Sequence, residues 1–462
     1  MRPRSGRLVR ALVFAVVALA PACADILGVE ERRTPGGGSG GASNGGASNG
    51  GASSGGTGGA PAGGGGADIG VGGAACVVAP CDATCEALVS SNADCGACGR
   101  TCADGLSCSG GVCDRRLRSS PSAYTTCMRT DAGLACWGND PYGESGNGAA
   151  SWAELGPALM TVLPADQVLL ASTASRSTCA IGADHTVRCF GNNQDGSLGI
   201  GPNDGGPDDG AGASACCYVA EVATPLLPSG ADVIDVVGGG AWERAEFYTA
   251  LTSDGDVYAW GNGAETPILK VQHALQIEAG IASACALLAT GEVDCWVPQI
   301  GAWFDNAVAA GAPFTVEGLG PIARIGAAHD SNFAIDVAGR VWAWGGSERG
   351  LLGPGTPMDG NRYYPPRLLG ADFDAQVVDV TGTTASACAL LTSGDVYCWG
   401  RNGWQGDGTI ENGAFDPTPK KALVDDVLEI AASNNSMYAR TADGRLLRWG
   451  AGRASPEPVA LP

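Results

Sequence analysis

Hydrophobic and polar positions follow one phrase that recurs seven times along the last three quarters of the chain. In each copy an apolar strand pattern leads into a polar turn, usually with glycine, and a second alternating strand ends near an aromatic residue. Each copy therefore predicts a β-hairpin. The copies are CMRTDAGLACWG (127–138), CAIGADHTVRCFG (179–191), TALTSDGDVYAWG (249–261), CALLATGEVDCWV (285–297), FAIDVAGRVWAWG (333–345), CALLTSGDVYCWG (388–400) and YARTADGRLLRWG (438–450).

Two further apolar patterns accompany most hairpins. A short apolar pattern such as ADVIDVVGGG (231–240) lies upstream, and a proline-bounded piece such as TPILK (266–270) lies further upstream. Seven units of about 50 residues with four short strands each predict an all-β fold, a seven-bladed β-propeller over 118–462. We expect Val459 to Leu461 to pair into the first blade and close the ring, which removes an exposed sheet edge.

The cysteines of these hairpins come in pairs. Four phrases carry both, and three have lost both, with Thr249/Ala259, Phe333/Ala343 and Tyr438/Arg448 in their places. Catalytic or metal-binding cysteines have no reason to vanish in pairs, whereas the two halves of a disulfide do. The spacing also places the two residues opposite each other across a hairpin, within disulfide reach. We therefore predict the disulfides Cys127–Cys136, Cys179–Cys189, Cys285–Cys295 and Cys388–Cys398.

The motif C-A-L-x-x-x-G-x-V-x-C-W-G, followed by a glycine-rich turn, resembles the regulator of chromosome condensation repeat family. Such turns follow in the first, second, fifth and sixth units, whereas WVPQIGAW in the fourth unit lacks the glycine. The resemblance covers about 118–462 and implies a seven-bladed propeller. The namesake is a nucleotide-exchange factor that docks on chromatin, and one secreted bacterial member is a β-lactamase inhibitor. No functional motif of either carries over to this chain.

The N-terminus predicts export. Residues 1–22 combine four arginines with a short apolar run, the organisation of a signal peptide and too short for a membrane span. The run ends in LAPAC, which resembles a bacterial lipobox and predicts a lipid on Cys23; cleavage after Ala20-Pro21-Ala22 by an ordinary signal peptidase is the alternative. Residues 23–75 are rich in Gly, Ala, Ser and Asn, and predict a lipid-anchored flexible linker.

Residues 76–113 hold eight cysteines. A segment this short has little room for a hydrophobic core, so we predict a small module held by disulfides of open connectivity. Zinc binding by CGACGRTC is the alternative, disfavoured in an exported chain with no histidine nearby.

The charge balance limits the partners. The chain has 27 Lys and Arg against 48 Asp and Glu, a net charge of −21. Such a chain repels phosphate backbones and anionic lipid, so we expect no nucleic-acid partner and no membrane contact apart from the lipid anchor. We expect a monomer in the outer membrane that faces the periplasm or the cell surface, or alternatively a secreted protein.

Candidate chemistry is sparse. The histidines His185, His273 and His329 lack metal-ligand spacing and are interpreted as solvated turn or strand-edge residues. An insert at 199–221 carries three weak Ca²⁺ candidates and a cysteine pair that could bond to each other, bond elsewhere or stay free. These are Asp204, Asp208, Asp209 and Cys216–Cys217. We find no catalytic constellation and expect no cofactor.

Aromatic residues divide into two groups. The recurring anchors are expected to pack between blades: Trp137, Phe190, Trp260, Trp296, Trp344, Trp399 and Trp449. The aromatic residues outside that register are candidates for binding a partner: Tyr142, Trp242, Trp303, Tyr363, Tyr364 and Trp404. The sequence thus predicts a lipoprotein whose propeller binds a protein or carbohydrate partner through loops of one face, with unequal inserts at 199–221, 297–316 and 345–364. The alternatives are a propeller enzyme, such as a lyase or glycan hydrolase, and a structural envelope protein.

Overall fold

The computed structural model describes most of the chain from residue 108 onward, within one compact unit, Gly70–Pro462. The signal peptide, the linker and most of the cysteine-rich module lie outside the described residues, and so do Cys23, Asp204, Asp208, Asp209, Cys216, Cys217, Trp242 and Trp303. The described residues are 108–109, 112–113, 116–118, 120–147, 151–164, 167–193, 196–201, 218–241, 244–262, 264–296, 311–360, 363–370, 373–410 and 412–462.

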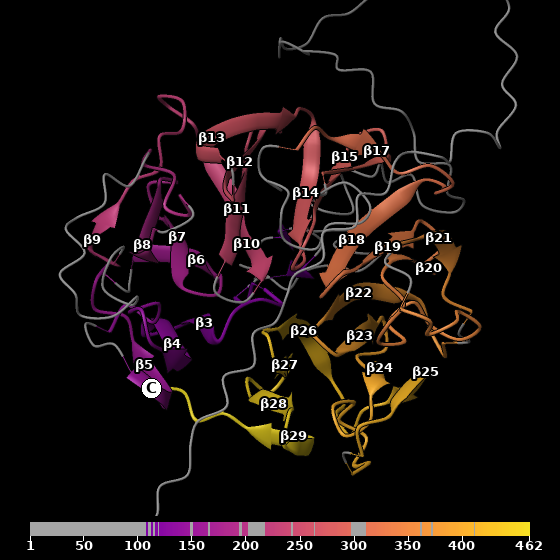
Figure 1. Cartoon of the computed structure of the whole chain (residues 1–462). Coiled ribbons are helices and arrows are strands. Elements are labelled where there is room, and N and C mark those ends of the chain that lie inside the picture. Colours follow the sequence, from indigo (N-terminus) through magenta and orange to yellow (C-terminus); the bar gives the residue numbers. More distant parts are fainter. Residues whose placement is uncertain are drawn as a thin grey trace, which may run out of the picture. The chain divides into compact units, whose positions relative to one another are not determined.

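The predicted propeller is confirmed. Seven antiparallel sheets follow one another along the chain and surround a common axis (Figure 1). In every blade the strands pair in chain order, from an inner strand to an outer one. Apart from these, a small hairpin of β1 (Cys108–Ser109) and β2 (Val112–Cys113) precedes the ring.

The blades have these strands. The first has β3 (Thr125–Thr130), β4 (Gly133–Asp140) and β5 (Ser151–Leu159); the second β6 (Val168–Thr173), β7 (Ser177–Gly182), β8 (Val187–Asn192) and β9 (Tyr218–Ala223); the third β10 (Val233–Ala241), β11 (Arg244–Thr252), β12 (Val257–Gly261) and β13 (Ala264–Val271); the fourth β14 (Ala274–Ala279), β15 (Ala284–Leu288), β16 (Val293–Trp296) and β17 (Phe314–Thr315); the fifth β18 (Ile322–Ala328), β19 (Ser331–Asp336), β20 (Val341–Gly345) and β21 (Tyr364–Leu368); the sixth β22 (Val377–Gly382), β23 (Ser386–Leu391), β24 (Val396–Arg401) and β25 (Phe415–Lys421); the seventh β26 (Val427–Ala432), β27 (Ser436–Thr441), β28 (Leu446–Gly450) and β29 (Arg453–Pro458).

In the first blade, the innermost strand position beside β3 is filled by residues 116–118, the segment that enters the ring. Leu117 forms an antiparallel bridge with Met128 of β3, and the Arg129 N–H donates to the Arg116 carbonyl at 3.0 Å. Residues 116–118 therefore complete this blade on the axis side.

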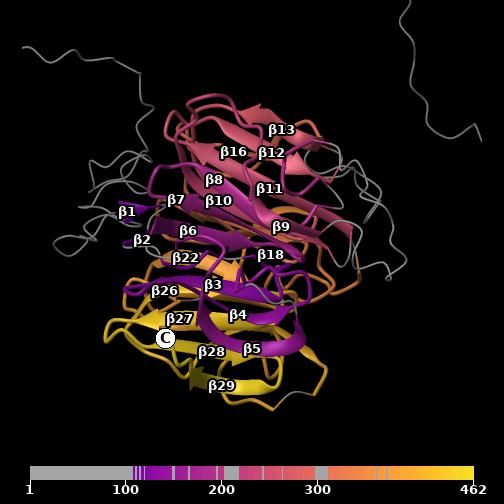
Figure 2. The same ribbon diagram turned by 90° about the vertical axis from the view of Figure 1, so that its left-hand side faces the viewer.

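The predicted ring closure by the C-terminus is wrong. The C-terminal strand β29 pairs with β28 of its own blade, and the Val459 N–H donates to Leu446 O at 2.8 Å. Val459 and Leu461 pack against the hydrophobic cluster between the seventh and first blades, and the C-terminus is drawn beside β27 and β28 (Figure 2). The ring closes through side-chain packing and the entering segment instead.

The proline-bounded pieces belong to the preceding blade, not to the blade that follows them. TPILK, for example, lies in β13, which pairs with β12 of the third blade as its outer strand. Proline removes a backbone donor, so it suits an outer edge strand and discourages pairing with another sheet. Prolines occur in β5, β13, β21, β25 and β29, all of which are outer strands.

The hydrophobic core consists of one cluster for each seam between neighbouring blades. The aromatic anchor of one blade packs against the preceding blade, and all seven anchors are at most 2% exposed. Trp260 and Trp399, for example, each donate an indole N–H to a carbonyl of the preceding blade at 2.8 Å. The anchors are therefore packing residues, as predicted.

At each of these seams, the anchor comes from the later blade and the cysteine pair, where present, comes from the earlier blade. All four are disulfides, with Cα atoms 4.0–4.1 Å apart in directly opposed register, as in Cys388 and Cys398. Each pair packs toward the next blade. Where the cysteines are missing, a ring can fill the space: Phe333 packs edge-on against Trp399, with centroids 5.8 Å apart.

Candidate functional site: the loop face and a pocket at the seventh seam

The two faces of the ring carry different connections. Because the strands of a blade alternate in direction, the turns between the second and third strands lie on one face, the turn face. The connections from the first to the second strand and from the third to the fourth lie on the other, the loop face. On the turn face the hairpin turns are short, for example 183–186, 337–340 and 392–395.

The loop face carries the long connections. Five of the third-to-fourth-strand connections are long: 141–150, 193–217, 297–313, 346–363 and 402–414. The strands that flank the predicted inserts end at this face, so the variable part of the chain is concentrated on one side of the ring. Loops held by a rigid scaffold are where proteins most often place binding residues.

Four of the predicted aromatic binding residues are described, and all lie at the loop face. The half-buried Tyr142 ring lies 5.8 Å from the Arg176 guanidinium carbon, and Tyr364 donates its hydroxyl to Asp359 at 2.8 Å. Tyr363 is half-buried, and this burial raises the pKa of its hydroxyl. Trp404 is only 7% exposed and packs under Arg401 at 5.4 Å. The three tyrosines are thus more accessible to a partner than Trp404.

The axis of the ring is filled by buried ion pairs. Arg118, from the entering segment, reaches Asp235 of the third blade at 3.0 Å and Glu278 of the fourth at 2.9 Å. Its guanidinium also donates to the Ile277 carbonyl at 2.5 Å. Burial alone lowers the pKa of Arg118, but the charges of the two carboxylates outweigh burial and raise it, so Arg118 is a fixed cation.

Two further axial carboxylates among the described residues, Asp379 and Glu429, are also paired. Asp379 accepts from Arg324 at 2.8 Å, and Glu429 accepts from Arg440 at 3.0 Å. Glu429 also accepts the backbone N–H of Leu117 at 3.0 Å. A catalytic centre on the axis requires carboxylates that can reach a substrate. The carboxylates of Asp235, Glu278, Asp379 and Glu429 converge on the axis, but each forms an ion pair with a buried arginine. They therefore act as a structural network.

A buried acid pair lies under the loop of the first blade. Asp140 and Glu144 are both 0% exposed. Burial, followed by the hydrogen bond with Asp140, raises the pKa of Glu144 well above its usual range. The Ser145 N–H donates to Asp140 at 3.1 Å and the Tyr142 N–H to Glu144 at 2.8 Å. The pair holds the loop together and has no opening to a substrate.

The three histidines occupy turn positions, and all have positive φ. His185 and His273 lie at the turn face and are exposed or half-buried, in agreement with the prediction. His329 differs: it is only 3% exposed, and its Nδ1 lies 3.0 Å from Asp330. The sequence gives no sign of this burial, which depends on the neighbouring blade: the Ile281 N–H of that blade donates to the His329 carbonyl at 2.7 Å. Within the described part of the chain no group of three or more His, Cys, Asp or Glu side chains has metal-binding geometry.

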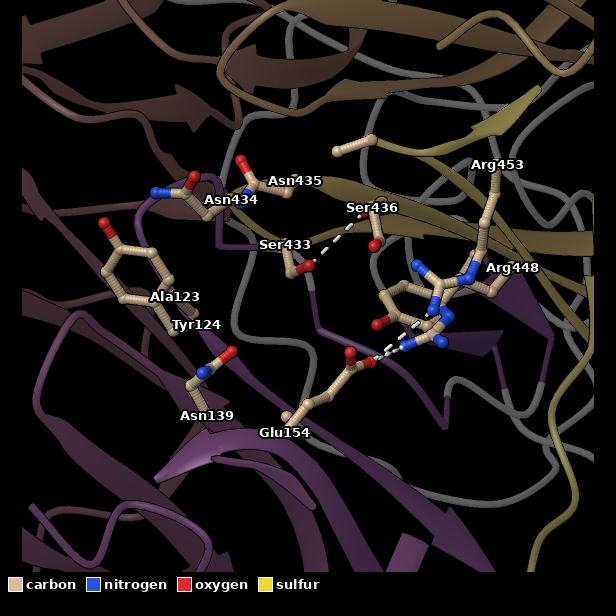
Figure 3. A pocket seen from close by; sticks show the side chains of 13 residues that line it. Ala123, Tyr124, Asn139, Glu154, Ser433, Asn434, Asn435, Ser436, Arg448 and Arg453 are labelled. Carbon is tan, nitrogen blue, oxygen red and sulfur yellow. Dashed lines mark hydrogen bonds and ion pairs between the residues drawn. The ribbon is translucent and has the colours of Figure 1, made fainter. Parts of the chain in front are cut away.

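One pocket opens at the loop face between the seventh and first blades, and we call it the seam pocket (Figure 3). It has a volume of about 190 Å3. Tyr124, Asn139 and Asn434 lie on one side of it, and Glu154, Arg448 and Arg453 lie on the other.

The floor of the seam pocket is the position that carries a disulfide in four other blades. In the seventh blade Tyr438 and Arg448 face each other across β27 and β28. The Tyr438 hydroxyl accepts from the Trp137 indole at 3.2 Å, and Arg448 forms an ion pair with Glu154 of β5 at 2.7 Å. The paired loss of cysteines was visible in the sequence, but only the structure reveals that the replacements line a pocket.

The fold and this arrangement define a class: a disulfide-supported seven-bladed propeller with a loop-rich face. Comparison of the sequence and the fold with known proteins shows which repeat family this propeller is similar to. Residues 377–403 match the family described as the regulator of chromosome condensation (RCC1) repeat. This match lies within the sixth blade and supports the resemblance that the repeated hairpin phrase carries.

The curated relatives match part of this chain and part of their own length. The human E3 ubiquitin-protein ligase HERC2 is 27% identical over 287 residues, which cover 53% of this chain but 6% of that protein. The mitochondrial RCC1 domain-containing protein RUG3 of Arabidopsis thaliana is 26% identical over 215 residues, 44% of this chain and 40% of that protein. The chain thus matches less than half the length of either relative.

Solved structures agree on the fold. Yeast RCC1 (Prp20), solved in complex with Kap60, has a TM-score of 0.59 at 19% identity and covers 75% of this chain and 85% of its own. Human WBSCR16 has a TM-score of 0.55 at 18% identity, with 71% and 87% covered. Among the residues that the structure describes, no helix is long and apolar enough to span a membrane.

Proposed function

We propose that this chain is an exported, lipid-anchored scaffold whose propeller binds a protein partner through its loop face. The observation that carries the proposal is the asymmetry of the ring. Long connections and the accessible tyrosines Tyr142, Tyr363 and Tyr364 share one face, whereas the other face has short turns. Tyrosines on rigidly held loops supply contact area at a low entropic cost, which is why they recur in protein interfaces.

The relatives support a binding role. Yeast Prp20 is described in complex with Kap60 and in terms of its binding to Gsp1p and histones. The HERC2 match spans too small a part of that ligase to suggest its activity here. Histones are basic, and this chain carries a net charge of −21, so a basic partner is also electrostatically favourable here.

The ion pairs on the axis favour a scaffold over an enzyme. Propeller enzymes need free acid, base or metal groups, whereas Asp235, Glu278 and Asp379 are held by arginines. A partner that docks on the loops leaves this network undisturbed.

Photo-crosslinking with the whole chain tests the binding face. A photoreactive phenylalanine analogue is placed at Tyr142 or Tyr363 on the loop face, and at Thr186 or Thr290 on the turn face as matched controls. We expect crosslinks to one recurring protein from the first two positions only. Equal crosslinking from both faces, or none from the loop face, would refute the proposal.

The anchor needs a separate experiment. Cys23→Ser removes the only thiol that a lipobox could lipidate, so we expect the variant to move from the membrane fraction to the soluble fraction of the producing cells. An unchanged membrane fraction would show that Cys23 is not lipidated. That result would not bear on the proposed binding face.

A further inference from the structure

The seam pocket differs chemically from the other six seams. In four seams a buried disulfide faces the next blade. In two seams the pair is Thr249/Ala259 or Phe333/Ala343, and these four residues are 0% exposed. Among the described residues only the seventh seam places a charged side chain, Arg448, at this position. An arginine with a tyrosine partner takes the place of a compact, apolar pair, and the result is a polar opening.

The lining combines donors and acceptors in planar groups. Asn434 is 3% exposed, yet its side-chain amide forms no hydrogen bond with the described residues; only its backbone does, to Ala123 and Thr384. An amide both donates and accepts. Across the pocket, Glu154 accepts from Arg448 through one oxygen, and the guanidinium keeps further N–H groups available. An amide in an open pocket that no described residue satisfies is suited to hydrogen bonding with a polar ligand.

The charge and the volume of the seam pocket limit the class of ligand that it can bind. Arg448 pairs with Glu154 at 2.7 Å, and Arg453 pairs with Glu457 at 3.4 Å, so each arginine is matched by a carboxylate and the site has no strong excess charge. The net charge of −21 further disfavours an anion. The volume of about 190 Å3 is below the roughly 300–1,000 Å3 of pockets for drug-sized ligands. It suits a single small ring.

We infer that the seam pocket binds one neutral sugar residue, either as a free monosaccharide or at the end of a glycan. Vicinal hydroxyls pair with planar amide, carboxylate and guanidinium groups, because each hydroxyl both donates and accepts. The half-buried ring of Tyr124 offers an apolar face to the C–H side of a pyranose. This site is separate from the proposed protein-binding loops, and either can fail without the other.

Binding is measured on the whole chain by calorimetry and saturation-transfer NMR. The probes are the methyl glycosides of glucose, galactose, mannose and N-acetylglucosamine, with N-acetylglutamate as the anionic comparison. We expect saturable binding of at least one glycoside and none of N-acetylglutamate. An array of neutral glycans then distinguishes a free monosaccharide from the terminal residue of a glycan. A glycan that binds at least tenfold more tightly than the methyl glycoside indicates a terminal residue, and equal affinities indicate a free sugar.

Three variants in the seam pocket and one control on the turn face test the assignment. Asn434→Ala and Tyr124→Ala are each expected to weaken binding at least tenfold, about 1.4 kcal/mol, while Gln272→Ala, an exposed amide on the turn face, changes it less than twofold. Glu154→Gln keeps an acceptor but leaves Arg448 unneutralised, so N-acetylglutamate should now bind. The inference is overturned if no glycoside binds, if both alanine variants bind normally, or if wild-type protein prefers N-acetylglutamate, which would indicate an acidic peptide side chain.

Discussion

The Arg118 ion pairs allow the sharpest prediction about stability. Arg118→Met removes the cation and keeps the aliphatic stem, so two buried carboxylates lose their partner. The Arg118 side chain is 1% exposed, and those of Glu278 and Asp235 are 9% and 12% exposed. Removing one member of a buried ion pair typically costs about 3–5 kcal/mol. We expect a loss of about that size in the free energy of unfolding.

The assay is equilibrium unfolding in guanidinium chloride under non-oxidising, non-reducing conditions, which leave the disulfides intact. The triple variant Arg118→Met, Asp235→Asn, Glu278→Gln replaces the whole network by neutral groups and should recover most of the loss. Arg445→Met, at an exposed ion pair with Asp443, is the matched control and should change little. A loss below about 1 kcal/mol for Arg118→Met, or a triple variant no more stable than the single one, would refute the reasoning.

Three further predictions concern the blades. Replacing Cys388 and Cys398 together by alanine should lower the free energy of unfolding by about 3 kcal/mol; an unchanged denaturation midpoint would contradict this. Gly199→Ala, at φ +68 with its Cβ 2.9 Å from an aromatic anchor, should cost about 2–4 kcal/mol, against about 1 kcal/mol for Gly230→Ala in open space; equal losses would exclude the packing explanation. Burial raises the pKa of Glu144 above its ordinary 4.5, so its stabilising contribution is full below pH 4.5 and is lost as pH rises through the folded-state pKa. Glu144→Gln should therefore gain stability over wild type at neutral and alkaline pH and lose that gain near pH 4.5; parallel pH profiles would contradict this.

Local patterns predicted the hairpins and the disulfide pairs, because each depends on residues of a single hairpin. The packing role of the anchors was predicted from their recurrence at one position of the repeated phrase. Pairing between distant or alternative neighbours could not be predicted in the same way. A proline-bounded strand between two hairpins can pair with either one, and the sequence interpretation assigned TPILK (266–270) to the wrong blade. The same ambiguity misplaced the C-terminal strand.

The site was harder to predict, for a related reason. The Arg118 network joins residues 117 and 160 positions apart, and no periodicity reports such contacts. Tyr438 and Arg448 were recognised only as positions without a disulfide. Their role depends on Glu154, which reaches Arg448 from the first blade, 294 positions away.

The central claim is that a protein partner docks on the loop face. Hydrogen–deuterium exchange of the whole chain, with and without the partner recovered by crosslinking, tests it most directly. Because docking excludes solvent from the covered amides, the account predicts added protection in residues 141–147, 346–360 and 402–410 and unchanged exchange in the turns 337–340 and 392–395. Protection confined to those turns, with unchanged loops, would contradict the account.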